Sequence, residues 1–296
     1  MKHLKLLETL TETARRERWN LFRFALWEDG ALAEREVIPS NIVNALYSVS
    51  KNYITTAVGM CLDDGLLGYD TTVWELFRDE YPDMNPLWRE VTVERVLSQT
   101  VGIGGMFLDI DCQDAFSWGG DWLRATLEVP FVTRPGERFA YSDSNFYLAS
   151  RMAAKVTGRP AQELLARRLF NPLKMQGWAW STCPAGHAVG GSGLYLRVAD
   201  MAKFGAVYLM GGSLDGVRVV SEDFVRRATH PVSHPGADTD YGLSFWLPKD
   251  AHGVIRGSGM YGQGIWIDPA ERFVLAWQAA DPEGEANPES VILAAR

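Results

Sequence analysis

The segment at residues 47–65, YSVSKNYITTAVGMCLDDG, contains both a chemical motif and the helix that would carry it. Ile54, Val58 and Leu62 recur at four-residue intervals, the spacing of one face of an α-helix. The pattern stops at Asp64-Gly65, a residue pair typical of a helix end. The sequence therefore predicts a helix that starts close to the beginning of this segment and fills most of it.

Ser48 and Lys51 form a Ser-x-x-Lys pair at the start of this predicted helix. Residues three apart project from the same helical face, so the amine can take the proton of the hydroxyl. Free N–H groups at a helix N-terminus also stabilise a developing oxyanion. An ordinary lysine has a pKa of about 10.4, so a catalytic one needs desolvation or neighbouring cations. The pair predicts an acyl-transfer site. The alternative interpretation of the same residues is that Ser48 is only a helix N-cap and Lys51 a solvated side chain.

A second polar segment, GERFAYSDSNFY at residues 136–147, is a turn followed by a predicted helix. Tyr141 could supply a proton-shuttling phenol, and Asp143 or Asn145 could bind the lysine amine. The alternatives are structural: the polar residues at 142–144 are good N-caps, and a tyrosine ring often anchors a core. Both interpretations remain open from this segment alone.

The third segment, GSGMYGQG at residues 257–264, is a glycine-rich strand pattern. Glycines within a strand mark places where a ligand or another backbone comes close. We therefore expect a substrate to lie along Ser258 and Gly259, with the backbone N–H of Met260 as a second oxyanion donor beside that of Ser48. A glycine-rich hairpin without a ligand is the alternative.

Composition excludes several classes of protein. The chain has 296 residues, 47% of them hydrophobic, which is too apolar for a disordered protein. Its 29 basic and 37 acidic residues give a formal charge of −8, which argues against nucleic-acid binding. The first twenty residues carry charges throughout, and no stretch approaches the roughly 20 apolar residues of a membrane span. With three cysteines in no metal-like spacing, we expect a cytoplasmic protein without a disulfide framework.

Strand patterns lie near both ends of the chain and helical patterns between them. Residues 18–38 are two apolar runs joined at Asp29-Gly30, as in a tight hairpin, and a second hairpin is expected over residues 264–279. We predict an α/β (α+β) fold, in which an antiparallel sheet of N- and C-terminal strands is flanked by helices and carries an inserted, mainly helical lobe.

The predicted division into lobes follows from this order. Residues 1–48 and 190–296 would form the sheet lobe, and residues 49–189 the mainly helical inserted lobe. Because no long linker separates them, we expect one integrated catalytic unit with the site in the groove between the lobes.

In their order and separations, the three segments resemble the serine β-lactamase and penicillin-binding-protein superfamily, closest to its class C-like branch of esterases and 6-aminohexanoate-dimer hydrolases. Further matches are LSQTVGI at 97–103, RPGERFAYSD at 134–143 and GLYLRVADMAKFG at 193–205. The resemblance covers roughly residues 20–280. It implies that Ser48 is the acylated nucleophile, Lys51 its base partner, and Tyr141 the residue that relays a proton to the leaving group.

Two departures from the family pattern bear on the substrate. Lactamases of this branch carry Tyr-x-Asn where this chain has Tyr141-Ser142-Asp143, and a carboxylate there would raise the pKa of the lysine. They also carry a basic residue or histidine before Thr-Gly, where this chain has Gly257-Ser258-Gly259. That cation would hold a substrate carboxylate. Arg256 is adjacent, but neighbouring strand residues point to opposite faces.

The resemblance implies a serine hydrolase that cleaves an ester or amide through a Ser48 acyl-enzyme. A β-lactamase or D-alanyl carboxypeptidase is the alternative within enzymes, and a catalytically lapsed acyl- or peptide-binding module is the alternative from another class. We expect no metal ion or other cofactor. The expected partner is a small ester, amide or short peptide, with neither nucleic acid nor membrane.

Overall fold

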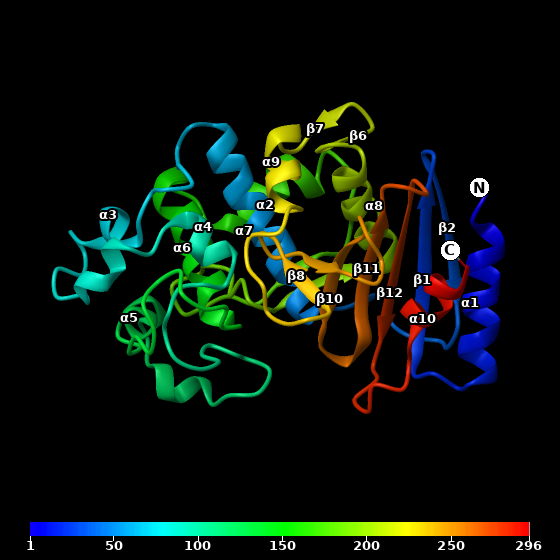
Figure 1. Cartoon of the computed structure of the whole chain (residues 1–296), viewed down its shortest axis with the longest axis horizontal. Coiled ribbons are helices and arrows are strands. Elements are labelled where there is room, and N and C mark those ends of the chain that lie inside the picture. The colour runs from blue at the N-terminus through cyan, green and yellow to red at the C-terminus, as the bar shows by residue number, and fades with distance from the viewer. Residues whose placement is uncertain (296) are drawn as a thin grey trace.

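A seven-stranded antiparallel sheet is the largest sheet within residues 1–295, the part of the chain that the computed structural model describes (Figure 1). In spatial order its strands are β2 (Ala31–Glu36), β1 (Leu21–Glu28), β12 (Phe273–Ala279), β11 (Gln263–Asp268), β10 (Ile255–Gly259), β9 (Trp246–Pro248) and β8 (Thr239–Tyr241). Strands from the two ends of the chain pair side by side. The predicted hairpins and the α/β (α+β) class are therefore confirmed.

Both faces of the central strands are buried. The sheet is covered by α1 (Leu4–Arg16) and α10 (Pro288–Ala295) on one face and by α8 (Val198–Leu209) on the other. In β1, Phe24 and Leu26 belong to the apolar cluster under α1, whereas Ala25 and Trp27 belong to the cluster on the opposite face. This alternation follows from the two-residue period of a strand, and it explains why β1 reads as a nearly continuous apolar run.

The other helices lie to one side of the sheet (Figure 1). They are α2 (Ser50–Asp63), α3 (Val73–Phe77), α4 (Val93–Leu97), α5 (Trp122–Leu127), α6 (Asp143–Thr157), α7 (Ala161–Leu165) and α9 (Glu222–Ala228). A three-stranded sheet of β3 (Val43–Ala45), β5 (Leu194–Arg197) and β4 (Ala179–Trp180) and a hairpin of β6 (Ser213–Leu214) and β7 (Val217–Arg218) complete the strands. The short turns used below are η1 (Tyr47–Val49), η3 (Ala115–Trp118) and η5 (Met260–Gly262).

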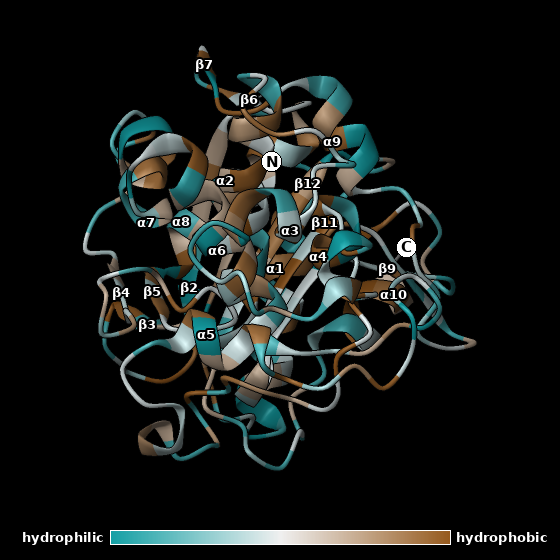
Figure 2. Cartoon of the chain, turned by 90° about the vertical axis from the view of Figure 1, so that its left-hand side faces the viewer, coloured by the Kyte–Doolittle hydropathy of each residue, from teal (hydrophilic) through white to brown (hydrophobic). Residues whose placement is uncertain are grey.

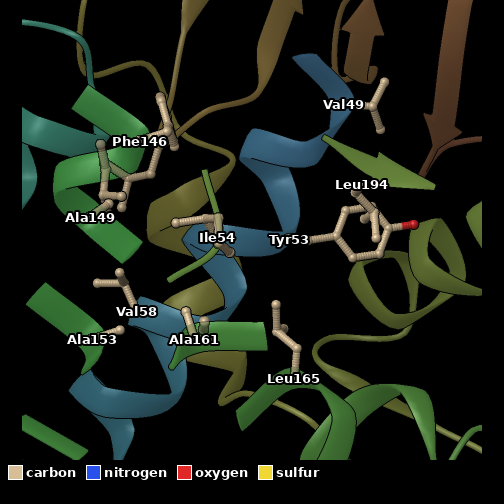
Figure 3. Close-up of a cluster of buried hydrophobic side chains, with 14 of the residues drawn as sticks. Val49, Tyr53, Ile54, Val58, Phe146, Ala149, Ala153, Ala161, Leu165 and Leu194 are labelled. Atoms are coloured by element: carbon tan, nitrogen blue, oxygen red, sulfur yellow. The ribbon is translucent and has the colours of Figure 1, made fainter. Parts of the chain in front are cut away.

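Helix α2 is buried along almost its whole length, because residues 50–61 are all shielded from solvent. It packs against α6 and α7, and Figure 3 shows Ile54 and Val58 on the side of α6 while Tyr53 points the other way. Tyr53 stacks on Phe204 of α8, with ring centroids 3.9 Å apart. The predicted helix is confirmed, and it links the helical part of the molecule to the layer that covers the sheet.

Apolar residues gather in α2 and the central strands, whereas hydrophilic residues lie on outward-facing parts such as the charged face of α9 (Figure 2). No helix within residues 1–295 is long and apolar enough to cross a membrane.

The helices at the two ends of the chain were not predicted from the sequence. In α1, Leu6, Leu7 and Leu10 are buried against the sheet, while charged residues occupy much of the remaining surface. These leucines and Ala14 share one helical face, so the segment does carry an amphipathic helical pattern, which the prediction overlooked among its many charges.

Two buried tyrosines, Tyr53 of α2 and Tyr208 of α8, give a test of the packing between these helices. The Tyr53 hydroxyl makes no hydrogen bond within the described residues, whereas the Tyr208 hydroxyl lies 2.8 Å from Thr56 Oγ1. A buried polar group without a partner destabilises the folded state, and a buried hydrogen bond contributes about 0.5–1.5 kcal/mol. We expect Tyr53→Phe to leave the free energy of unfolding unchanged or raise it, and Tyr208→Phe to lower it by about 1 kcal/mol.

Urea unfolding followed by circular dichroism measures both variants, and each is the control for the other because both remove one oxygen from a buried ring. A larger loss of stability in Tyr53→Phe than in Tyr208→Phe would contradict the packing described here.

Candidate active site

Ser48 lies in the single 3₁₀ turn η1 that leads into α2, rather than at the first residue of the α-helix. Leu46 and Val49 occupy the N-cap positions of the two elements, so Ser48 is not a helix cap. Tyr47, the residue before it, has φ = +48°, a conformation that a bulky side chain rarely adopts. Such strain persists only where the surrounding structure holds it, which is common beside functional residues.

The Lys51 amine is buried, with 1% of the residue exposed, and all three of its hydrogens have acceptors. Its Nζ donates to Ser48 Oγ at 2.9 Å, to Asp143 Oδ1 at 2.6 Å and to the Gly191 carbonyl oxygen at 2.7 Å. These acceptors come from η1, from the first residue of α6 and from the glycine-rich segment before β5. A cation with three such partners is the charged ammonium form.

The pKa of Lys51 reflects a balance of opposed effects. Burial alone lowers it, but the charges and hydrogen bonds of Tyr141 and Asp143 outweigh burial, so the pKa of Lys51 is raised above its ordinary value. This is the direction expected from an aspartate at position 143. Lys51 at neutral pH is therefore a hydrogen-bond donor to Ser48 and must lose a proton before it can accept one.

Tyr141 lies beside this pair, with Lys51 Nζ 4.6 Å from the centroid of its ring. The ring stacks on that of Trp246 at the end of the sheet, with centroids 6.1 Å apart and an interplanar angle of 20°. A phenol held between a cation and an indole has little freedom to rotate away. Tyr141 is thus presented to the same spot as Ser48 by a part of the chain 93 residues away in sequence (141 − 48).

Gln99 fixes the backbone that carries Tyr141. Its side-chain oxygen accepts the N–H of Ser142 at 3.1 Å, and its amide donates to the Ser142 carbonyl at 3.2 Å. The same oxygen accepts a hydrogen bond from the Asn145 amide. Asn145 is not among the three acceptors of Lys51, so of the two predicted candidates it is Asp143 that binds the lysine amine. Gln99 itself is fully buried and has φ = +61°. In the sequence, Gln99 stands out only as part of the LSQTVGI match to the family. Its role in holding the Ser142 backbone depends on contacts between distant segments and could not be predicted.

The glycine-rich strand β10 closely approaches η1, the turn that carries Ser48. A Cβ on Gly259 would lie 2.4 Å from the Leu46 carbonyl oxygen, which is closer than non-bonded atoms come. Only a glycine therefore allows β10 to pack against η1 at this point. The next residue, Met260, begins the turn η5 beside Ser48.

One cleft of about 380 Å³ brings most of the predicted site residues together. Its lining includes Ser48, Tyr141, Asp143, Ser258, Gly259 and Met260. Lys51, the remaining predicted residue, lies beneath the cleft and is bonded to two of them. A wider hollow of about 950 Å³ beside α9 contains Ser221 and His230, but Ser221 there is an N-cap bonded to Asp63. The smaller cleft is therefore the candidate active site.

The family model for "Beta-lactamase" matches residues 38–295, which include this whole site. The chain belongs to the beta-lactamase family. The resemblance inferred from the sequence motifs is confirmed.

The proteins that are similar to this beta-lactamase-family chain include hydrolases of different names. It is 27% identical over 161 residues to the 6-aminohexanoate-dimer hydrolase of Paenarthrobacter ureafaciens, a match covering 50% of this chain and 41% of that one. Its fold is similar to a putative 6-aminohexanoate-dimer hydrolase from Bacillus anthracis (TM-score 0.78, 18% identity, 96% and 78% of the two chains). It is also similar to a family VIII carboxylesterase (TM-score 0.74, 18% identity, 95% and 92%).

These matches define the fold and family more sharply than the activity. The structural likenesses have low sequence identity and show a shared fold. The chain spans less than two thirds of the length of the curated relatives it matches, with 41%, 61% and 33% of three of them covered.

The Asp143 carboxylate should control how readily Ser48 reacts as a function of pH. A negative neighbour disfavours loss of a proton from Lys51, so its removal eases that step. Asp143→Asn keeps an oxygen that can accept from Lys51. We expect the pH midpoint for reaction of Ser48 with a fluorophosphonate to move down by on the order of one pH unit in this variant.

The midpoint is measured by mass spectrometry of the Ser48 peptide after timed labelling between pH 5 and 10. Asp79→Asn, which removes a charge from an exposed residue, is the control and should leave the midpoint unchanged. A midpoint that stays or rises in Asp143→Asn would show that this carboxylate does not set the protonation state of the site.

Proposed function

We propose that this chain is a serine hydrolase that cleaves an ester or amide bond through an acyl-enzyme on Ser48. The observation that carries the proposal is the 2.9 Å hydrogen bond between Lys51 Nζ and Ser48 Oγ at the base of a cleft that also contains Tyr141. A hydroxyl bonded to a desolvated amine, with a phenol at hand, is the arrangement that activated serine nucleophiles require.

The proposed reaction has two halves. Ser48 Oγ forms a bond to the carbonyl carbon while its proton passes to the Lys51–Tyr141 pair, after Lys51 has released the proton that it holds at rest. The C–O or C–N bond of the tetrahedral intermediate then breaks, and Tyr141 delivers the proton to the leaving group. Water attacks the acyl-enzyme by the same steps in reverse and releases the acid.

The charge that develops on the carbonyl oxygen needs donors that are already in place. We assign this role to the backbone N–H groups of Ser48 and Met260. The close packing of β10 on η1 at Gly259 supports the assignment, because it brings the two backbone segments to one side of the cleft. Preorganised donors of this kind contribute roughly 10²–10³ in rate.

We also propose a reducing compartment, in keeping with a cytoplasmic enzyme. Cys61 and Cys183 are buried as free thiols, and Cys112 is a free exposed thiol. Burial raises the pKa of Cys61 to about 12, which makes it a poor nucleophile.

Replacement of the nucleophile tests the proposal directly. We expect Ser48→Ala to lower kcat/KM for p-nitrophenyl butyrate by roughly a thousandfold or more, because the substitution removes the cleft hydroxyl that is hydrogen-bonded to Lys51. Ser290→Ala, at an exposed residue of α10, is the matched control and should retain activity.

Mass spectrometry after fluorophosphonate treatment should show one adduct, on the peptide that contains Ser48. Full activity in Ser48→Ala would reject the mechanism. A single acylation of the wild-type protein without turnover would instead identify an acyl-binding module that has lost hydrolysis. Nitrocefin turnover at ordinary enzyme rates would favour the β-lactamase or D-alanyl carboxypeptidase alternative.

A further inference from the structure

Three carboxylates line the cleft around Ser48. Asp109 and Asp111 come from the loop before η3, and Asp143 comes from α6. Among the residues within 1–295 that line the cleft there is no lysine, arginine or histidine. The nearest cation, Lys51, lies below the floor and is paired with Asp143. The cleft therefore presents a surplus of negative charge to any substrate that enters it.

Asp111 is the carboxylate most open to a ligand. Asp109 is 3% exposed and its Oδ1 accepts the Asp111 backbone N–H at 3.0 Å, so it holds the loop in shape, whereas Asp111 itself is exposed. Partial desolvation raises the pKa of Asp111, and the charges of Asp109 and Asp143 add to this. Asp111 is thus within electrostatic range of the catalytic pair, yet has room beside it.

A buried hydroxyl lies next to Asp111. Ser192 is 1% exposed, and its hydroxyl lies close enough to act as a hydrogen-bond donor to Asp111, which lowers the pKa of that carboxyl. A buried donor at such a place helps to hold the Asp111 carboxylate in its charged form.

Neither position 257 nor Arg256 can supply a cation that would bind a substrate carboxylate in the cleft. A Cβ on Gly257 would lie 2.7 Å from Asn52 Oδ1, and Asn52 is held by its Nδ2, which donates to the Ser244 carbonyl at 2.8 Å. A basic side chain at 257 therefore has no space. Arg256 forms an ion pair with Glu289 of α10, which directs it away from the cleft.

We propose that the cleft selects substrates that carry a positively charged group, such as a protonated amine, a few bonds from the scissile carbonyl, with Asp111 as the residue that binds this group. This inference rests on the proposed Ser48 hydrolase function and names its substrate class. The same surplus charge disfavours substrates that carry a carboxylate, including β-lactams and peptides with a free C-terminus.

Three p-nitrophenyl esters that share a six-carbon acyl chain test the proposal. They differ only in the group at the end of the chain away from the ester, which is a trimethylammonium, a methyl or a carboxylate group. We expect kcat/KM to fall in that order at low ionic strength, by about tenfold at each step, because each step changes one unit charge near Asp111. In 0.5 M NaCl the differences should shrink, since exposed charges are then screened.

Asp111→Asn should reduce the preference for the cationic over the carboxylate ester by about tenfold, and Asp111→Lys should reverse the order of these two. Asp215→Asn, on the β6–β7 turn outside the cleft, makes the same change of charge and should leave all three rates unchanged.

The proposed substrate class is wrong if the three esters react at equal rates or if the carboxylate ester reacts fastest. If turnover is still lost in Ser48→Ala, the proposed hydrolase function is retained in either case. Hydrolysis of none of the esters by the wild-type protein would reject both. A preference that is the same in Asp111→Asn and in the wild-type protein would remove Asp111 from the binding site.

Discussion

The organisation of this protein depends on one buried ammonium group. Transfer of a lysine from water into a protein interior is costly unless acceptors replace its hydration shell. Lys51 finds three acceptors, on Ser48, Asp143 and the Gly191 carbonyl. Because these belong to separate segments of the chain, the requirement to solvate one charge fixes the mutual position of η1, α6 and the glycine-rich segment before β5.

The fold supplies the rigid frame in which such a group can be held. Helix α2 packs against α6 and α7 and, through Tyr53 and Thr56, against α8, which in turn packs on the sheet that joins both ends of the chain. A polar residue near the start of a helix so enclosed has few alternative rotamers. The position of the Lys51 amine is therefore set by packing along the helix as well as by its hydrogen bonds, and the geometry around Ser48 follows from both.

Sequence alone indicated the residues whose chemistry is local. Ser48 and Lys51 are three residues apart, and the polar tripeptide with Tyr141 stands out before a helix. The contributions of Gln99, Asn52 and Asp111 could not be found in this way, since each depends on contacts between elements distant in sequence. Gln99 braces Ser142 across 43 residues, and Asn52 closes the space beside Gly257 only because β10 lies against α2. Helix α1 differs from these, because the leucines of its apolar face recur at helical spacing in the sequence and could have been recognised there.

On the proposed mechanism, the carboxylates of the cleft act on Lys51 and Tyr141 and on the substrate at once. A negative charge at Asp143 holds Lys51 as an ammonium, which makes the lysine a weaker base at rest and a better electrostatic partner for an ionised phenol or alkoxide. A cationic substrate reverses part of this effect, because a positive group near Asp111 offsets the negative field felt by Lys51 and Tyr141. Substrate binding would then ease the proton loss that the resting site resists. The aspartate at position 143 and the glycine at position 257 therefore serve the same selectivity. Asp143 suits a site that becomes active when a positively charged substrate binds. Gly257 leaves the cleft without a cation that could bind a competing, negatively charged substrate.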